Sequence, residues 1–317
     1  MKQTIGACVV TYNRKDLLIR CLNAILRQEY LPDGIVIVDN VSTDSTFEEI
    51  TTRMFPGLIF RYENESGFVY EGDIIVANRS MSVVYIQKKV NDGGSGGFYA
   101  AMKEAFNRGY DWLWLMDDDG LPDRKELKEL YNKSVEYHLQ YANALVLDIK
   151  DPTHFSFGLS KGRLVYTVED AKKKPVIEDV ANPFNGTFVS REVIEKIGFI
   201  KKEMFIWGDE KEYMARAVHN GIGLYTIPAA IHYHPKEKGK KGNIIPFVSK
   251  YQILVKPQRM SHYYYRNEGF IYNTYPEKKK HMMAFCVAHM VYNITHFRFV
   301  ELAKFIKYFR KGMHNEY

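Results

Sequence analysis

Three consecutive carboxylates, Asp117, Asp118 and Asp119, directly follow the apolar run at residues 112–116. Adjacent carboxylates repel one another unless water or a cation neutralises them. In an extended turn the first and third can point to one side while the second points elsewhere. They then supply two oxygen ligands for Mg²⁺ or Mn²⁺ and leave positions for diphosphate oxygens. We therefore predict a divalent-cation site at Asp117 and Asp119, with an acidic surface loop as the alternative.

A second acidic cluster is Trp207-Gly208-Asp209-Glu210. An indole face suits stacking on a sugar, so Trp207 is a candidate for contact with an acceptor. Of two adjacent carboxylates, one can orient a hydroxyl group while the other takes its proton, which makes Asp209 and Glu210 candidates for a general base. An ordinary acidic helix start, stabilised by the helix dipole, is the alternative interpretation.

Two histidines, His232 and His234, alternate in a strand-like stretch and therefore share a face. One of them is a candidate metal ligand beside the aspartates, and a structural role is the alternative. The stretch after them is basic, with Lys236, Lys238, Lys240 and Lys241 close together. We expect a flexible loop over residues 236–262, either simply solvated or able to close over a diphosphate.

These side chains must be positioned by a regular framework. Short apolar runs at residues 4–10, 34–38, 83–86 and 112–116 predict buried strands, and helical spacing at residues 15–28, 45–54 and 98–107 predicts helices between them. Strands that alternate with helices indicate an α/β fold with a mainly parallel sheet, whose ligand site lies at the carboxyl ends of the strands. Residues 56–82 show no clear period and stay unassigned.

Further candidates stand at the ends of the first two predicted strands. Asn13 and Arg14 offer an amide and a cation to a phosphate, and Asp39 can accept hydrogen bonds from a base or ribose. The glycine-rich loop at residues 91–97 fits neither the phosphate-loop pattern nor the dinucleotide fingerprint, which argues against nucleotide-triphosphate hydrolysis and dehydrogenase chemistry. Its glycines, Gly94 and Gly96 among them, still permit close approach of a ligand to the backbone.

The composition is that of a globular protein: 317 residues, 46% hydrophobic and 26% charged. The N-terminus does not resemble a signal peptide, no window reaches the length of a membrane span, and three scattered cysteines fit a reduced compartment. We expect a cytoplasmic protein, with the inner face of the cell membrane as an alternative. The net charge of +6 favours anionic partners, but no nucleic-acid-binding motif is present.

The C-terminal part, from about residue 263, is aromatic-rich and predicted to be helical, with a break at Pro276. Residues 282–309 carry an aromatic, apolar face together with basic side chains such as Arg298 and Lys304. We expect this segment to rest on an anionic membrane, where lipid-linked acceptors reside. Packing against the catalytic domain, or against a second subunit in a homo-oligomer, is the alternative.

Taken in order, these motifs resemble those of the family 2 inverting glycosyltransferases, and within them the galactofuranosyl- and rhamnosyltransferase branch. The motifs are residues 9–14, 38–40, 91–97, 117–119 and 207–210, together with His234. The match covers about residues 4–235, and residues 263–267 are similar to a motif that starts the family's C-terminal helices. The resemblance implies a GT-A fold, Rossmann-like, with a catalytic domain at 1–235, the flexible basic loop at 236–262 and a C-terminal helical region at 263–317.

The resemblance also implies roles for individual residues. It places Glu210 as the base and Asp209 as its neighbour, although this chain has Glu where the family often has Asp, so the choice between them stays open. The family's metal-binding histidine maps onto His234, with His232 as the alternative. The implied metal ligands are Asp117, Asp119 and that histidine, and the implied donor-binding residues are Thr11, Asn13, Arg14, Asp39, Gly94, Gly96, Asp117 and Asp118.

The implied reaction is an in-line displacement at the anomeric carbon of a nucleotide-sugar donor of the UDP-galactofuranose or dTDP-rhamnose class, aided by Mn²⁺ or Mg²⁺. The acceptor would be a hydroxyl of a saccharide or lipid-linked saccharide in cell-surface polysaccharide synthesis. A sugar nucleotidyltransferase is one alternative, but it needs a glycine-rich basic loop where Thr11-Tyr12-Asn13-Arg14 stands. A catalytically silent binding protein of the same fold is the other, and the two acidic clusters argue against it.

Overall fold

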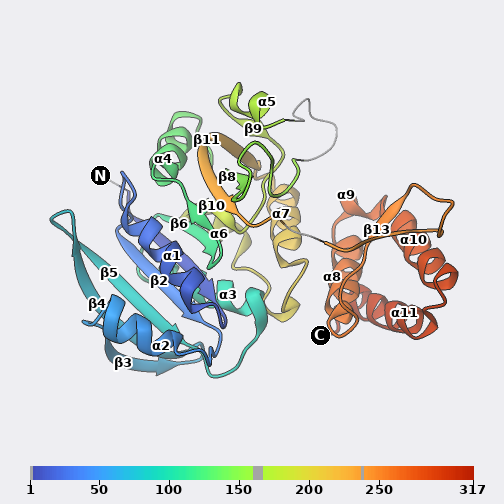
Figure 1. Ribbon diagram of the computed structural model, residues 1–317, viewed down its shortest axis with the longest axis horizontal. Coiled ribbons are helices and arrows are strands. Elements are labelled where there is room, and N and C mark those ends of the chain that lie inside the picture. The colour runs from blue at the N-terminus through green and yellow to red at the C-terminus, as the bar shows by residue number, and fades with distance from the viewer. Residues whose placement is uncertain (1–2, 160–166, 237–238) are drawn as a thin grey trace. The chain divides into compact units, whose positions relative to one another are not determined.

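The computed structural model describes residues 3–159, 167–236 and 239–317 (Figure 1). Its contacts divide the chain into two compact units. The first unit comprises residues 1–202 and 220–236, and the second comprises residues 203–219 and 237–317. The second therefore takes in residues 203–219, which the sequence assigned to the catalytic domain. Lys238 of the predicted basic loop lies outside the described residues.

The first unit is built on one large mixed sheet (Figure 1). Four parallel strands form its centre, in the order β5 (Arg79–Gln87), β2 (Gly34–Asp39), β1 (Ile5–Thr11) and β6 (Trp112–Asp117). Beyond β6 follow β10 (Asn185–Ser190), β8 (Tyr141–Asp148), β11 (Tyr225–His234) and β7 (Leu121–Pro122), with β9 (Ile177–Glu178) also paired to β11. The predicted α/β fold with a mainly parallel sheet is confirmed. Beyond the four central strands, β8 and β11 pair in parallel and run in the same direction as β6, and β10 between β6 and β8 is antiparallel to both of its neighbours.

The unassigned residues 56–82 form the other edge of this sheet. They contain β3 (Ile59–Asn64), β4 (Gly67–Val76) and the start of β5, paired as an antiparallel ribbon. Every residue of β3 except the last is exposed. A strand that buries neither face has no need to alternate apolar and polar residues, which explains why the sequence showed no period here.

Helices cover both faces of the sheet. Those of the first unit are α1 (Lys15–Leu26), α2 (Thr46–Glu48), the π-helical turn η1 (Glu49–Met54), α3 (Gly93–Asn107), α4 (Glu126–Glu136), α5 (Val168–Lys172) and α6 (Arg191–Ile197). On α1 the side chains of Leu18, Cys21, Leu22 and Ile25 are fully buried, as their spacing predicts. All of β1 is buried as well, so the polar residues at its end are held by a rigid core.

The glycine-rich segment is not the loop that the sequence predicted. Helix α3 begins at Gly93, and the glycines form its first two turns. Their low helix propensity suggested a loop, but their lack of a side chain lets the helix lie against β1. A Cβ at Gly97 would stand only 2.4 Å from Cγ1 of Val10.

The second unit is mainly helical. It contains η2 (Lys202–Met204) in part, α7 (Asp209–His219), α8 (Ser261–Thr274), α9 (Pro276–Lys279), α10 (Met282–Thr295) and α11 (Phe299–Met313). The predicted break at Pro276 is confirmed, since α8 ends just before it. A hairpin of β12 (Lys241–Asn243) and β13 (Gln252–Leu254) occupies part of the segment predicted to be a flexible loop.

Helices α8 and α11 pack closely because each places a glycine at the crossing. A Cβ at Gly269 would lie 2.2 Å from the carbonyl oxygen of Phe309, and one at Gly312 would lie 1.8 Å from that of Arg266. Neither position tolerates a side chain without moving the helices apart. Within the described ranges, no helix has the length and apolar character needed to cross a membrane.

Candidate active site

The ends of β1 and β6 bring Thr11, Arg14 and the aspartates together. The two strands are parallel neighbours, with Val10 opposite Asp117, so the residues that follow them meet at one edge of the sheet. The hydroxyl of Thr11 donates to Oδ2 of Asp118 at 2.7 Å. Nη1 of Arg14 lies 3.1 Å from Oδ1 of Asp118 and 2.9 Å from Oδ2 of Asp119. One guanidinium thus neutralises two of the three carboxylates.

Asp118 is the buried member of the three aspartates. Burial raises its pKa to about 6, although the hydrogen bonds from Thr11 and Arg14 act in the opposite direction. Burial lowers the pKa of Arg14, but the charges of Asp118 and Asp119 outweigh it and the net shift is upward. The carboxylate of Asp118 is therefore bound by Thr11 and Arg14, in line with the expectation that it points away from a metal.

His234 approaches the aspartates because the turn after β6 reverses into β7, which pairs with β11 at the register Tyr233 to Leu121. Its Nε2 lies 3.0 Å from Oδ1 of Asp119. Its Nδ1–H donates to the carbonyl oxygen of Pro235 at 2.7 Å, so Nε2 is the ring nitrogen that faces Asp119. Burial lowers the pKa of His234, but Asp119 outweighs it and the pKa is raised.

Asp119 and His234 form an ion pair, with 3.0 Å between Oδ1 and Nε2. The same separation is compatible with two adjacent ligands of an octahedral ion, whose bonds are about 2.1 Å long. Across the described ranges, no three or more His, Cys, Asp and Glu side chains gather as a metal site. Asp117, the third predicted ligand, ends β6 and does not complete such a group. The remaining positions around an ion would fall to phosphate oxygens and water, as is common for Mg²⁺.

The alternative ligand, His232, has another partner. It is fully buried, and its Nδ1 lies 3.0 and 3.1 Å from the two carboxylate oxygens of Glu126. Nε1 of Trp114 donates to the same carboxylate at 3.1 Å. Nε2 of His232 packs under the aspartate turn, since a Cβ at Gly120 would stand 2.3 Å from it. These contacts suit support of the turn and favour His234 as the ligand.

Sequence reasoning missed Glu126. Burial raises its pKa, although the nearby His232 and Trp114 act in the opposite direction. Its only signal in the sequence was an acidic residue near the start of a helix, which ordinarily means a solvent-exposed terminus.

Asp39 is held at the end of β2 by two donors. Its side chain is fully buried; Oδ2 accepts from the hydroxyl of Tyr85 at 2.5 Å, and Oδ1 accepts from the backbone N–H of Ser42 at 2.8 Å. Burial, with the charge of Asp39 adding to it, raises the pKa of Tyr85. Sequence reasoning missed Tyr85 as well, because it lies inside an apolar strand and its partner is 46 residues away.

Asn13 ties the loop after β1 to the loop after β2. Its backbone N–H donates to Oγ of Ser42 at 2.8 Å, and its Oδ1 accepts from the backbone N–H of Thr43 at 2.6 Å. The backbone N–H of Lys15 donates to Asp44 at 3.0 Å, which adds a second tie between the loops. The predicted donor-binding residue Asn13 thus also shapes the edge of the site.

The two predicted glycines differ in their surroundings. A Cβ at Gly94 would meet nothing within 4 Å, so its backbone is open to a ligand, whereas a Cβ at Gly96 would stand 1.9 Å from Cγ of Asp92. Asp92 is in turn contacted by the buried ammonium of Lys88. Close approach of a ligand therefore remains possible at Gly94, while Gly96 accommodates a side chain of the protein itself.

The second acidic cluster lies in the second unit, whereas the three aspartates lie in the first. Helix α7 begins at Asp209, and the residue before it, Gly208, has a φ of +125° that disfavours any side chain. Asp209 is buried and Glu210 is partly exposed. Oε2 of Glu210 accepts from the backbone N–H of Gly208 at 3.2 Å.

The side-chain amide of Asn267 holds this turn in place. Its Nδ2 lies within 3.0 Å of the carbonyl oxygens of Met204, Ile206 and Trp207. Its neighbour Arg266 donates to the carbonyl oxygen of Glu203 at 2.7 Å. The predicted motif at residues 263–267 therefore fixes the backbone that leads into Asp209 and Glu210.

Comparison with known proteins supports the resemblance to family 2 glycosyltransferases that the sequence motifs indicated. Residues 7–68 match the family model for glycosyl transferase family 2. Galactofuranosyltransferase GlfT1 of Mycobacterium tuberculosis (strain ATCC 25618 / H37Rv) is 30% identical over 241 residues, which cover 74% of this chain and 71% of that protein. GlfT1 of Mycolicibacterium smegmatis is 27% identical over the same length and the same shares.

Among solved structures, S. aureus TarS 1-349 in complex with UDP-GlcNAc has a TM-score of 0.55 at 13% identity, over 99% of this chain and 93% of that one. At this identity the likeness concerns the fold, and it agrees with the GT-A fold that the resemblance implied. The family model, the extended match to GlfT1 and this fold lead to one conclusion: the chain belongs to family 2 of the glycosyltransferases.

Proposed function

We propose that this glycosyltransferase transfers galactofuranose from its UDP donor, with inversion, to a hydroxyl of a saccharide or lipid-linked saccharide in cell-surface polysaccharide synthesis. A dTDP-rhamnose class donor is the alternative. The relatives named as galactofuranosyltransferases favour the first, and TarS structures contain UDP and UDP-GlcNAc. The observation that carries the proposal is the Asp119–His234 pair beside Arg14 and Asp118 at the carboxyl edge of the sheet.

In this proposal the donor binds along the ends of β1, β2 and β6. Exposed Asn13 lines this edge and is proposed to contact the donor. The buried side chains of Asp39 and Thr11 would hold the strand ends on which the base, ribose and phosphates lie. Asp119 and His234 hold Mn²⁺ or Mg²⁺, with Asp117 as a further candidate ligand. When bound, the ion neutralises the charge that develops on the departing diphosphate. The open backbone at Gly94 leaves room for the donor beside α3.

Glu210 is proposed as the general base. It takes the proton from the acceptor hydroxyl while that oxygen forms a bond to the anomeric carbon, and the bond from that carbon to the diphosphate oxygen breaks on the opposite face. Its partial exposure supports this role, because the neighbouring Asp209 is buried. Trp207, two residues before that pair, is proposed to contact the acceptor.

The test compares donors and then variants. UDP-galactofuranose and dTDP-rhamnose are incubated with the enzyme, with and without Mn²⁺, and release of nucleoside diphosphate is measured. Asp209→Asn and Glu210→Gln should both retain donor binding by calorimetry. The variant that lacks the base should lose transfer by about 10²- to 10⁴-fold. Full transfer by both variants would mean that the base lies elsewhere, and nucleotide binding without any transfer would support a silent binding protein.

We also propose that the second unit rests on the anionic inner face of the cell membrane. Met283, Val287, Met290 and Ile294 of α10 are exposed at spacings of three and four residues, so they form one apolar stripe. Exposed Phe297 continues it. The adjoining α11 carries Lys307, Arg310 and Lys311, whose charges complement anionic lipid.

Flotation with vesicles tests this contact. The protein should float with phosphatidylglycerol vesicles and less with phosphatidylcholine vesicles, and Val287→Ser with Ile294→Ser should reduce the bound fraction. If the double variant floats as before but changes from a dimer to a monomer in light scattering, the stripe is an interface between two copies of the chain instead.

A further inference from the structure

A cavity of about 600 Å³ lies within the second unit. The β12–β13 hairpin forms one wall, α10 and the start of α11 form another, and Trp207 contributes an aromatic surface. Its volume falls in the usual range of small-molecule sites. Nothing in the proposed donor site accounts for it, since the residues of that site belong to the first unit.

The hairpin is anchored firmly enough to give the cavity a defined shape. A Cβ at Gly242 would stand 2.5 Å from the ring of Tyr292, so the strand lies directly on α10. Oγ1 of Thr295 donates to the carbonyl oxygen of Ile244 at 2.8 Å, which fixes the hairpin at a second point. The pairing continues past the strands, because the N–H of Val255 donates to the carbonyl oxygen of Lys240 at 2.8 Å.

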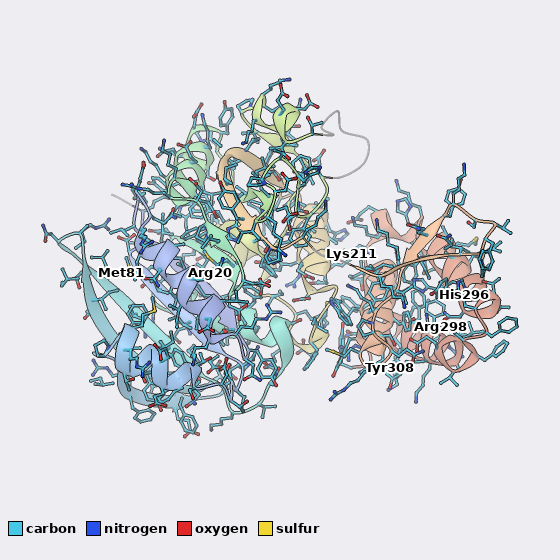
Figure 2. The ribbon with its side chains drawn as sticks, viewed as in Figure 1. Arg20, Met81, Lys211, His296, Arg298 and Tyr308 are labelled. Carbon is cyan, nitrogen blue, oxygen red and sulfur yellow. The ribbon has the colours of Figure 1, made fainter. Side chains whose placement is uncertain are left out.

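The charge of the cavity is positive. Lys240, Lys256 and Arg298 line it, and its described lining includes no Asp or Glu. Arg298, labelled in Figure 2, directly precedes α11, and its guanidinium lies 5.5 Å from the centre of the Tyr292 ring. Three cations gathered around one cavity favour a ligand with at least two negative charges, and a guanidinium binds phosphate oxygens through paired hydrogen bonds.

Trp207 connects this cavity to the proposed chemistry. Nζ of Lys256 lies 4.5 Å from the centre of the Trp207 ring, which keeps the ammonium at the aromatic wall. Glu210 follows only three residues later, and three residues span at most about 11 Å. The backbone of the proposed base therefore lies within about 11 Å of the backbone of a residue that lines the cavity.

We infer that this cavity binds the phosphate or diphosphate group of an anionic acceptor, through Lys240, Lys256 and Arg298. The inference rests on the proposed function, because it specifies the acceptor of that reaction. It distinguishes the acceptor's phosphate, bound in the second unit, from the donor's diphosphate, bound in the first. Trp207 then contacts the sugar that the phosphate carries.

Binding of inorganic pyrophosphate to the full chain tests the site without any donor sugar. Calorimetry in EDTA compares the unaltered protein with Lys240→Gln/Lys256→Gln and with the control Lys241→Gln/Lys250→Gln, which removes the same charge from neighbouring lysines outside the lining. We expect about 10- to 100-fold weaker binding in the first variant only. Equal binding in all three, or a loss caused instead by Arg14→Gln, would overturn the inference.

Kinetics with two acceptors then identify the source of the phosphate. One acceptor carries its saccharide on an alkyl diphosphate, and the other carries the same saccharide as an uncharged alkyl glycoside. Lys240→Gln/Lys256→Gln should raise KM for the charged acceptor about 10-fold or more, and leave KM for the neutral acceptor unchanged. An equal rise for both would contradict the inference. If no acceptor is used by the unaltered protein, the proposed function fails, while pyrophosphate binding still decides whether the site exists.

Discussion

The contact between α3 and β1 allows a prediction with an internal control. Gly94 and Gly97 stand in the same glycine run at the start of α3, and both can be replaced by alanine. A Cβ at Gly97 would lie 2.4 Å from Cγ1 of Val10 and 3.0 Å from Nδ2 of Asn40, whereas one at Gly94 would meet nothing within 4 Å. Carbon atoms in contact are about 3.5–4.0 Å apart, so Gly97→Ala requires a shift of about 1 Å.

The magnitude follows from two opposing effects. Alanine in place of glycine in a helix stabilises by up to about 1 kcal/mol, and this gain is broadly similar at the two positions. Overpacking a buried contact costs about 1–3 kcal/mol, and it applies at Gly97 alone, because Val10 and Asn40 are buried. The free energies of unfolding of the two variants should therefore differ by about 1–3 kcal/mol, and Gly94→Ala should be the more stable variant.

Urea unfolding followed by tryptophan fluorescence measures the difference. The midpoint should fall for Gly97→Ala relative to the unaltered protein, and it should stay level or rise for Gly94→Ala. Equal midpoints for the two variants would refute the close contact between α3 and β1, because the general effect of alanine cancels in the comparison.

Three further predictions concern buried polar groups and the metal. Tyr85→Phe should lower the free energy of unfolding by about 1.5–3 kcal/mol in urea titrations, because buried Asp39 loses a donor, while Tyr70→Phe on the neighbouring strand should change it little. Asp119→Asn should abolish the increase in UDP affinity that Mn²⁺ causes, and leave the affinity measured in EDTA nearly unchanged; an undiminished Mn²⁺ effect would contradict the metal assignment. Burial lowers the pKa of His289 from 6.5 to about 4. Between pH 6.5 and pH 4 this imidazole is therefore protonated in the unfolded chain but not in the folded one. The free energy of unfolding should fall by about 2 kcal/mol from pH 7 to pH 5. His289→Leu should lack this component in urea titrations at the two pH values, and an identical pH dependence would contradict it.

Part of the site could be predicted because it depends on local pattern. Apolar runs of strand length that alternate with amphipathic helices specify parallel strands, and parallel strands deliver the residues after them to one edge. Thr11, Asp39 and the aspartate triplet each follow such a run, so their common location at that edge was predictable. The break before Pro276 was predictable for the same reason, since proline cannot continue a helix.

Other features depend on residues far apart in the chain. The pairs Tyr85–Asp39 and Glu126–His232 join positions 46 and 106 residues apart, and neither leaves a local pattern. The exposed β3 has no period, because no buried face imposes one.

The three aspartates show where the two kinds of information meet. The sequence by itself determined that they follow a buried strand and need positive charge, because adjacent carboxylates cannot be desolvated unpaired. Only the tertiary structure decided how that charge is divided. Asp118 is paired with Arg14 from the neighbouring strand end, and Asp119 meets His234 because β7 pairs with β11. Strand order and register therefore decide which cationic or imidazole side chain each aspartate contacts, and both are set by packing across the whole sheet.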